Sequence, residues 1–339
     1  MKRPTMRDIA KTVGTSAVTV SKAMAGKPGM SDKLRAKILK KAAEMGYEYP
    51  GTDRVVLRQH LDIGVLIPDR YFETESFYAQ MYKKLIQKLS EQGHFGLLEI
   101  LSAEDEEKLV PPMLIRSGRV DGMILLGEPS KAYYRMIAQQ NTPVVFLDFY
   151  DEHGSADALV GDNLYGCYRL TSHLIRIGHR KIGYVGSVRA TSSIMDRFLG
   201  YYRAMLTHNL PVRPDWIIPD RKDNGELIPI ELPEELPTAF VCNCDVVAMA
   251  LIRALNEHGY RVPEDVSVTG FDDFVTGPEP EIRLSTFKIN TPAMIELAVK
   301  TMAERCSGAH GPFGRTVISG QPVYRDSEIP LENGETEKE

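Results

Sequence analysis

Residues 5–24 read TMRDIAKTVGTSAVTVSKAM, which contains two short helical patterns around a Gly-Thr-Ser turn. Thr5 stands where an N-cap is expected, and Gly14 stands where a left-handed residue closes the first helix. Ser16 caps a second helix over about residues 17–25. Two helices joined by so short a turn predict a helix-turn-helix, whose second helix fits the major groove of DNA. The apolar positions of the first helix have helical spacing: Met6, Ile9, Ala10 and Val13.

A third helix is predicted to open at Ser31, after the break Gly-Lys-Pro-Gly at residues 26–29. Three helices in fewer than fifty residues close only a small core, so we expect this unit to gain stability from a partner or from DNA. The third helix carries one apolar stripe: Leu34, Ile38, Leu39, Ala42 and Met45.

Charge divides the 339-residue chain in two. Residues 1–50 contain eleven Lys and Arg against four Asp and Glu, a net charge of +7, and the remaining chain carries −12, within the total of −5. A basic head on an acidic body is expected when one small domain meets a polyanion and the rest does not.

Residues 8–47 read DIAKTVGTSAVTVSKAMAGKPGMSDKLRAKILKKAAEMGY, and this run resembles, without gaps, the amino-terminal headpiece of LacI-type transcriptional repressors. The resemblance implies a DNA-binding domain over residues 1–49. It places Ala17, Val18 and Lys22 at base-reading positions, where small apolar groups meet a thymine methyl and a lysine donates to guanine. Hydroxyls suit phosphate oxygens, and the resemblance gives that role to Thr5, Ser16, Thr19, Ser21 and Ser31.

The family places a hinge helix that enters the minor groove at residues 50–60. This sequence departs from the pattern, because Gly51 and Thr52 stand where helix formers are expected and residues 55–56 are β-branched. Either Val56 or Leu57 is the candidate wedge between bases, and a plain flexible linker is the alternative interpretation.

From Asp62 onward, buried strands alternate with amphipathic helices, which predicts an α/β fold with parallel sheets. No glycine-rich phosphate motif follows a strand, so we expect no nucleotide cofactor. In the first lobe, strands are expected at 62–68, 96–101, 121–127 and 143–149, with helices at 76–91, 104–117 and 131–140. In the second, helices are expected at 163–177, 193–208 and 245–258, with strands at 181–187, 238–243 and 267–273.

Four blocks of the body also resemble the LacI-type effector-binding half: residues 173–186, 197–206, 237–255 and 262–273. The resemblance implies two doubly wound lobes of periplasmic-binding-protein type over residues 61–330. We expect lobe 1 at about 61–157 and 286–310, lobe 2 at about 158–285 and 311–330, and a disordered acidic tail at 331–339. Chain crossings between the lobes are expected near residues 150–157, 275–285 and 286–291.

The family's effector pocket is carried over residue by residue. Arg197 matches an arginine that holds ligand oxygens through its forked guanidinium. Asp272 and Asp148 match carboxylates that follow strands of the second and first lobes, and Phe77 or Phe149 is the candidate platform under a sugar ring. Relatives carry Asn-Asp where this chain has Cys244-Asp245, so Asp245 keeps its match, and Asn243 supplies the amide only through a shift.

Other chemistries find little support. The four cysteines, at 167, 242, 244 and 306, form no CxxC pair and predict no metal site. No serine stands in a nucleophile elbow, and no histidine is arranged as a catalytic base, so we expect no enzyme. The charged start MKRPTMRD lacks a signal-peptide apolar region, and no apolar run is long enough for a membrane span, so a cytoplasmic location is expected.

These observations predict a homodimeric repressor that reads a pseudopalindromic operator and responds to a small-molecule effector, most simply a sugar. Two alternatives stay open. The effector is instead a nucleobase or a phosphorylated metabolite, or the chain is a sugar-binding receptor without DNA function.

Overall fold

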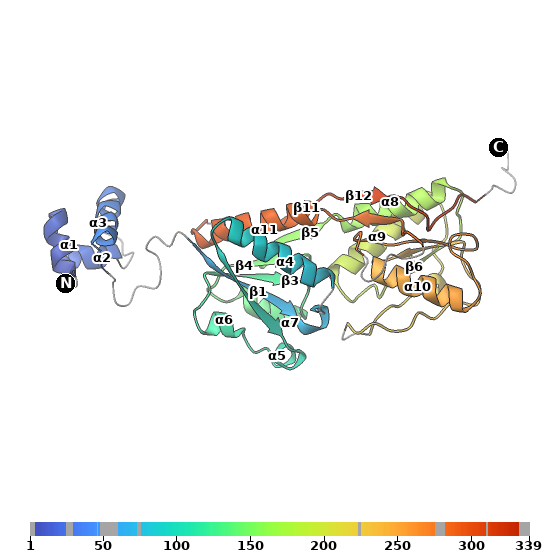
Figure 1. The fold of residues 1–339 in the computed structure, drawn as a ribbon, viewed down its shortest axis with the longest axis horizontal. Coiled ribbons are helices and arrows are strands. Elements are labelled where there is room, and N and C mark those ends of the chain that lie inside the picture. Colours follow the sequence, from blue (N-terminus) through green and yellow to red (C-terminus); the bar gives the residue numbers. More distant parts are fainter. Residues whose placement is uncertain are drawn as a thin grey trace. The chain divides into compact units, whose positions relative to one another are not determined.

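The computed structural model describes residues 4–24, 30–45, 47, 60–72, 76–222, 225–274, 282–309 and 311–331. The chain divides into two compact units, Met1–His60 and Leu61–Glu339. We call the first the headpiece and the second the body, and each is described by itself (Figure 1).

The headpiece contains three helices, α1 (Met6–Val13), α2 (Ala17–Met24) and α3 (Asp32–Glu44). Thr5 and Asp8 form a capping box at the start of α1, and Gly14 closes it at a φ of 77°, which confirms both predicted caps. The three helices pack around fully buried Ile9 and Val20, together with Ile38 of α3.

The first lobe of the body is a six-stranded parallel sheet in the order β11-β5-β4-β3-β1-β2. Figure 1 shows helices on both of its faces. Its strands are β1 (Asp62–Pro68), β2 (Phe95–Leu101), β3 (Gly122–Leu126), β4 (Val144–Leu147), β5 (Asp157–Gly161) and β11 (Arg315–Ile318). Its helices are η1 (Asp69–Tyr71), α4 (Phe77–Glu91), α5 (Ala103–Glu107), α6 (Met113–Arg116), α7 (Lys131–Ala138) and α11 (Thr291–Cys306).

The second lobe has a four-stranded parallel sheet in the order β7-β6-β8-β9, and a two-stranded antiparallel pair, β10 with β12, lies beside it. Its strands are β6 (Ile182–Val185), β7 (Ile217–Ile218), β8 (Ala239–Cys242), β9 (Ser267–Thr269), β10 (Thr286–Lys288) and β12 (Gln321–Val323). Its helices are α8 (Asn163–Arg176), α9 (Ser192–Thr207), η2 (Pro214–Trp216) and α10 (Asp245–Glu257).

The structure differs from the sequence-based expectation in one helix, in two lobe boundaries and in strands β5, β7, β10, β11 and β12, which the pattern did not predict. The helix expected at 104–117 is two short helices, α5 and α6, because Pro111 and Pro112 interrupt it. Strand β5 pairs with β4, so the first crossing follows Gly161 rather than lying at 150–157. Strand β11 pairs with β5 in the first sheet although residues 311–330 were expected in the second lobe. This edge strand is mostly exposed and therefore lacks the apolar pattern of a buried strand.

The chain therefore crosses between the lobes at about residues 161–163, 288–291 and 318–321. No crossing corresponds to the one expected at 275–285, because the described residues on either side, Phe274 and Leu284, both belong to the second lobe. The hinge at 50–59 and the tail at 332–339 lie outside the described residues. The carboxyl ends of both parallel sheets carry the side chains considered next.

Candidate functional site

Helix α2 presents the predicted base-reading face of the headpiece. Val18 is 65% exposed, and Lys22, one turn later, is also exposed, whereas Val20 on the opposite face is fully buried. Ala17 is partly exposed at the start of the helix. Because the side chains of Val18 and Lys22 are exposed, they do not pack in the core of the headpiece. This face of α2 is therefore available to contact another molecule.

Hydroxyl side chains surround this face and cap the helices. The Ser16 hydroxyl accepts a hydrogen bond from the Thr19 amide at 3.1 Å and lies 2.8 Å from the Thr19 hydroxyl. The Ser31 hydroxyl accepts from the Leu34 amide at 3.3 Å at the start of α3. Thr5 donates its hydroxyl to Asp8. Each hydroxyl thus marks a helix amino end, where backbone N–H groups attract anions.

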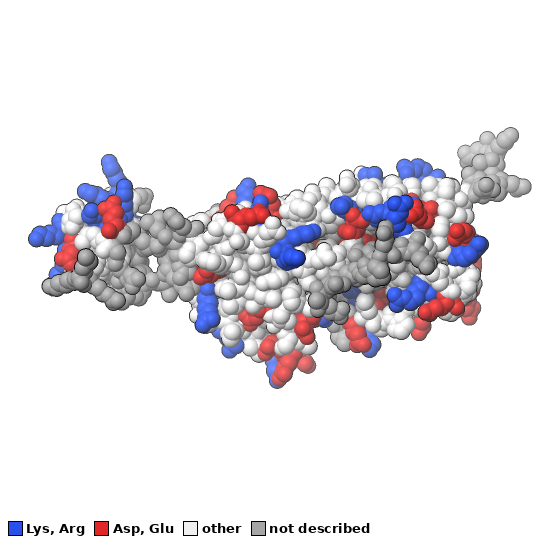
Figure 2. All heavy atoms as spheres, in the orientation of Figure 1, with Lys and Arg blue, Asp and Glu red and all other residues white. Residues whose placement is uncertain are grey.

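Figure 2 shows Lys and Arg side chains clustered on the headpiece. Ser21, also predicted to contact phosphate, is partly exposed on α2. Val56 and Leu57, the two candidate minor-groove wedges, lie outside the described residues.

Arg197 lies on the first turns of α9, and 5% of its surface is exposed. Its Nε donates to Asn163 Oδ1 at 2.8 Å and its Nη1 to the carbonyl of Asn243 at 2.6 Å. The guanidinium carbon lies 4.0 Å from the ring centroid of Phe271. These contacts fix the plane of the guanidinium, which still has unassigned N–H groups.

Asp272 is the carboxylate partner of Arg197. Arg197 Nη2 donates to Asp272 Oδ1 at 2.9 Å, and both residues belong to the second lobe. Asp272 follows β9 with a φ of 104°, a conformation that L-residues rarely adopt. Burial raises the pKa of Asp272 to about 7, against the opposing charge of Arg197. The pair is thus held in place at a cost in backbone strain and desolvation.

Asp148 faces this pair from the first lobe. It follows β4 with a φ of 70° and is 3% exposed. Tyr78 donates its hydroxyl to Asp148 Oδ2 at 2.8 Å, but Oδ1 is buried without a hydrogen-bond partner. Burial raises the pKa of Asp148, and the positive charge of Arg197 lowers it. A buried carboxylate oxygen without a donor is costly, so the site is incomplete as it stands.

The two residues expected from the Asn-Asp match have internal partners. The amide of Asn243 donates to the carbonyl of Val185 at 3.1 Å and to Asp220 Oδ2 at 2.8 Å. Asp245 accepts from the hydroxyl of Thr286 at 2.7 Å and from the amide of Phe274 at 2.6 Å. Asn243 therefore joins Arg197 to the neighbouring strand, while Asp245 holds the chain after β9 in place.

The two aromatic candidates lie in different surroundings. Phe149 is fully buried and packs on Phe146 and Tyr134, with centroids at 4.6 and 5.5 Å. It belongs to the core of the first lobe, so its expected place under a sugar ring is wrong. Phe77 is partly exposed at the start of α4 and meets Phe274 of the second lobe at 5.7 Å. Phe77 therefore contacts the opposite lobe.

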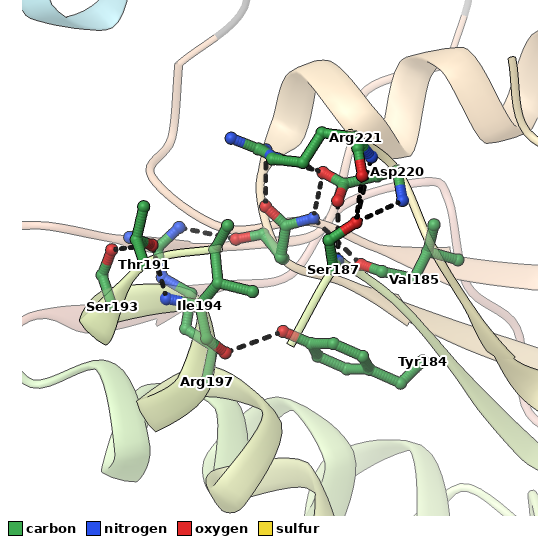
Figure 3. Close-up of polar contacts among 10 residues, drawn as sticks. Tyr184, Val185, Ser187, Thr191, Ser193, Ile194, Arg197, Asp220 and Arg221 are labelled. Atoms are coloured by element: carbon green, nitrogen blue, oxygen red, sulfur yellow. Dashed lines mark hydrogen bonds and ion pairs between the residues drawn. The ribbon is translucent and has the colours of Figure 1, made fainter. Parts of the chain in front are cut away.

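Sequence reasoning missed a second arginine–aspartate pair. Arg221 donates through Nε and Nη2 to Asp220 Oδ2 at 3.0 and 2.7 Å, and Asp220 Oδ1 accepts from the amide of Ser187 at 2.7 Å. Figure 3 shows that this pair and Arg197 come from separate elements of the second lobe. The two-residue strand β7 gives almost no sequence signal for the pair. Their adjacency, Asp220-Arg221, was the only available sign.

Within the described part of the chain, no group of three or more acidic, histidine or cysteine side chains could hold a metal ion. The helices described there also include none that is long and apolar enough to cross a membrane.

Comparisons with known proteins agree with this arrangement. Residues 5–49 match the model for bacterial regulatory proteins of the lacI family, and residues 171–328 match a periplasmic binding protein-like domain. The chain is 26% identical over 329 residues to the ribose operon repressor of Haemophilus influenzae, covering 95% of this chain and 98% of that protein. It is also 26% identical over 336 residues to the transcriptional repressor PurR of Haemophilus influenzae, covering 95% and 98% of the two chains.

The fold is similar to that of the transcriptional regulator CelR in complex with cellobiose, at a TM-score of 0.68 and 21% identity, covering 96% of this chain and 100% of that one. The lacI-family match over the headpiece rules out a receptor that lacks a DNA-binding domain. The relatives are transcription regulators rather than enzymes. This chain accordingly joins a DNA-binding domain of the lacI family of bacterial regulatory proteins to a periplasmic binding protein-like domain, and it is an effector-controlled, DNA-binding transcription regulator.

Proposed function

We propose that this regulator is a repressor whose effector is a saccharide bound between the two lobes of the body. The observation that carries this proposal is the grouping of the Arg197–Asp272 pair in one lobe with Asp148 Oδ1 in the other. The groups interact electrostatically across the lobe interface, because the charge of Arg197 shifts the pKa of Asp148 and Asp148 in turn shifts that of Asp272.

A polyhydroxylated ligand matches this chemistry. A sugar hydroxyl donates its hydrogen to Asp148 Oδ1 and so removes the unsatisfied acceptor. A neighbouring hydroxyl oxygen accepts from the guanidinium of Arg197, whose fixed plane gives directional recognition. Phe77 and Phe274 supply aromatic surface for the apolar face of a sugar ring. The names of the ribose operon repressor and the CelR–cellobiose complex support the same class of ligand.

The headpiece is proposed to bind a pseudopalindromic operator as part of a homodimer in the cytoplasm. Ala17, Val18 and Lys22 would meet base edges, and the surrounding hydroxyls would meet phosphates. Strand β2, at the edge of the first sheet, offers the dimer surface together with α6. The side chain of Leu98 in β2 is 37% exposed, and that of Met113 in α6 is 59% exposed. Burying such apolar side chains against a second copy arranges two headpieces on one two-fold axis.

A thermal-shift screen tests the effector class. The panel contains pentoses, hexoses, disaccharides, nucleosides and phosphosugars, because a ligand at about 100 times its dissociation constant adds roughly 2.7 kcal/mol of stability. We expect neutral saccharides to raise the unfolding midpoint of the intact chain. A rise with nucleosides alone or with phosphosugars alone would replace the saccharide by that class of effector.

Selection of bound fragments from random duplex DNA tests the operator. We expect recovered sites to contain two related half-sites, and binding that weakens steeply with salt. The same titrations, repeated with the stabilising ligand, show whether that ligand releases the DNA or tightens its binding.

A further inference from the structure

Glu128 of the first lobe is bonded directly to the second lobe. It follows β3, is 9% exposed, and its Oε2 accepts from the amide and the hydroxyl of Ser192, each at 2.7 Å. Ser192 is the first residue of α9, the helix that carries Arg197. This contact joins the two lobes directly, so it depends on how the lobes meet.

Glu128 is itself held firmly on the first-lobe side. Its backbone carbonyl accepts from Arg70 Nη2 at 3.1 Å and from the hydroxyl of Tyr71 at 3.3 Å. Arg70 is in turn paired with Glu106, whose Oε1 accepts from the amide of Ser130 at 2.5 Å. The loop that carries Glu128 is thus anchored to the first lobe at Glu128 and at Ser130.

A second cross-lobe contact lies one turn further along α9. Tyr150, from the first lobe, donates its hydroxyl to Asp196 Oδ1 at 3.0 Å. Arg315 of β11 approaches Asp196 Oδ2 at 3.9 Å, and its guanidinium carbon lies 4.4 Å from the Tyr150 ring centroid. The first lobe therefore contacts Ser192 and Asp196, on either side of one helical turn, and Arg197 follows immediately.

We propose that Glu128 is a positioning residue that closes the two lobes before any effector binds, by holding the first turn of α9 with its carboxylate. We call Glu128, Ser192, Tyr150 and Asp196 the cross-lobe latch. The inference rests on the proposed function in one respect: the closed arrangement is the one in which Asp148 and Arg197 face the same ligand.

The size of the effect follows from the kind of bond. Glu128 accepts two hydrogen bonds as an anion, and its charge also faces the positive end of the α9 dipole. Hydrogen bonds to charged groups contribute enough to change the closed-to-open ratio by about 10- to 100-fold. A latch of this strength shifts the ligand-free equilibrium toward the closed form, so effector binding loses less affinity to conformational change.

Distance measurements between the lobes test the latch without any ligand. Spin-labelled amino acids are incorporated by genetic encoding at Glu107 of α5, in the first lobe, and at Glu257 of α10, in the second lobe, both of which are exposed. Labelled chains are diluted with unlabelled ones, so that only one subunit of a dimer carries the pair. The comparison is the effector-free full chain against its Glu128→Ala and Glu128→Gln variants.

We expect a single short distance in the effector-free chain, a longer and broader distribution in Glu128→Ala, and an intermediate one in Glu128→Gln. Glu104→Gln is the matched control, because Glu104 is an exposed acid of the same lobe that pairs with Lys108, the residue that caps its own helix. Its distances are expected to equal those of the parent. Equal distances in Glu128→Ala and the parent would overturn the latch.

Ligand binding gives a second readout, with ribose and cellobiose as the probes. Glu128→Ala is expected to weaken the binding of whichever probe binds the parent by about tenfold or more. Unchanged affinity in a correctly folded Glu128→Ala would also contradict the latch. Failure of both probes to bind the parent would count against the proposed saccharide effector, whereas the ligand-free distances judge the latch separately.

Discussion

The two lobes meet at one interface, but the charged groups that they contribute to it have different partners. In the second lobe the charged groups are paired with each other, Arg197 with Asp272 and Arg221 with Asp220. In the first lobe, Asp148 has one oxygen without a hydrogen-bond partner, and the carboxylate of Glu128 accepts hydrogen bonds from Ser192 across the interface. The charged groups of the second lobe thus have partners within that lobe, whereas the first lobe leaves Asp148 Oδ1 for the proposed ligand and extends the Glu128 carboxylate to the second lobe.

Among the predicted substitutions, Arg197→Ala should have the largest effect, because it removes the cation of the buried ion pair in the second lobe. It leaves Asp272 buried without its cation, and losing one partner of a buried ion pair costs about 3–5 kcal/mol. Urea denaturation of the body measures this, and effector titrations should show no ligand response while operator binding by the headpiece persists. Arg203→Ala on the same helix is the control, because Arg203 is exposed and only covers Tyr168, at 5.3 Å. A loss below about 1 kcal/mol is expected there.

Asp148→Asn should act on binding and not on folding. An asparagine keeps the acceptor for Tyr78 and tolerates the positive φ, and it removes a buried charge with one unsatisfied oxygen. We therefore expect no loss of stability but a fall in effector affinity of about 10- to 100-fold, since a charge-assisted bond is lost. Calorimetric titration measures the affinity. Equal losses of stability and affinity would erase the contrast between the lobes.

Asp245 should make the free energy of unfolding depend on pH. Burial, followed by the charge of Asp272, raises its pKa from 3.8 to about 8. Between these values the folded protein holds a proton that the unfolded chain releases, so this group's contribution falls as pH rises from about 4 to about 8. Each pH unit changes it by at most about 1.4 kcal/mol. Asp245→Asn should flatten the slope of the denaturation midpoint against pH, and an unchanged slope would exclude this origin.

Substitutions of Phe149 and Phe77 should have the smallest effects, and they distinguish a core residue from an interface residue. Phe149→Leu should lower the stability of the first lobe by about 1 kcal/mol with little change in effector affinity, because the ring is fully buried among other aromatics. Phe77→Leu should do the reverse, since Phe77 is partly exposed and meets Phe274 across the interface. Thermal unfolding and ligand titration of both variants give the answer.

Local signals predicted the headpiece almost completely. Thr5 and Gly14 cap α1 through contacts within a few residues, so the sequence alone specifies them. The pattern of buried strands and amphipathic helices predicted four of the six strands of the first sheet and three of the four strands of the second. It did not predict β5 or the two-residue β7, and it did not predict β11, because an exposed edge strand carries no apolar alternation.

Asp148, Asp272 and Arg197 were predicted from the family resemblance, and each lies shortly after a buried strand or in the first turns of a helix. Their role in effector binding stays a prediction. Phe149 also follows β4 but turns into the core, because the side chain after Asp148 points to the opposite face. Glu128 and Arg221 were missed for another reason: their partners come from distant segments, and a polar side chain shows no pairing until the chain is folded.

Fluorescence anisotropy of the intact chain on its selected operator tests the central claim most directly. The titration is run with and without the saccharide that raises the unfolding midpoint of the protein. A ligand bound between the lobes and coupled to the headpiece should change operator affinity by about 5- to 150-fold. The same operator affinity with the saccharide bound and unbound would contradict the account.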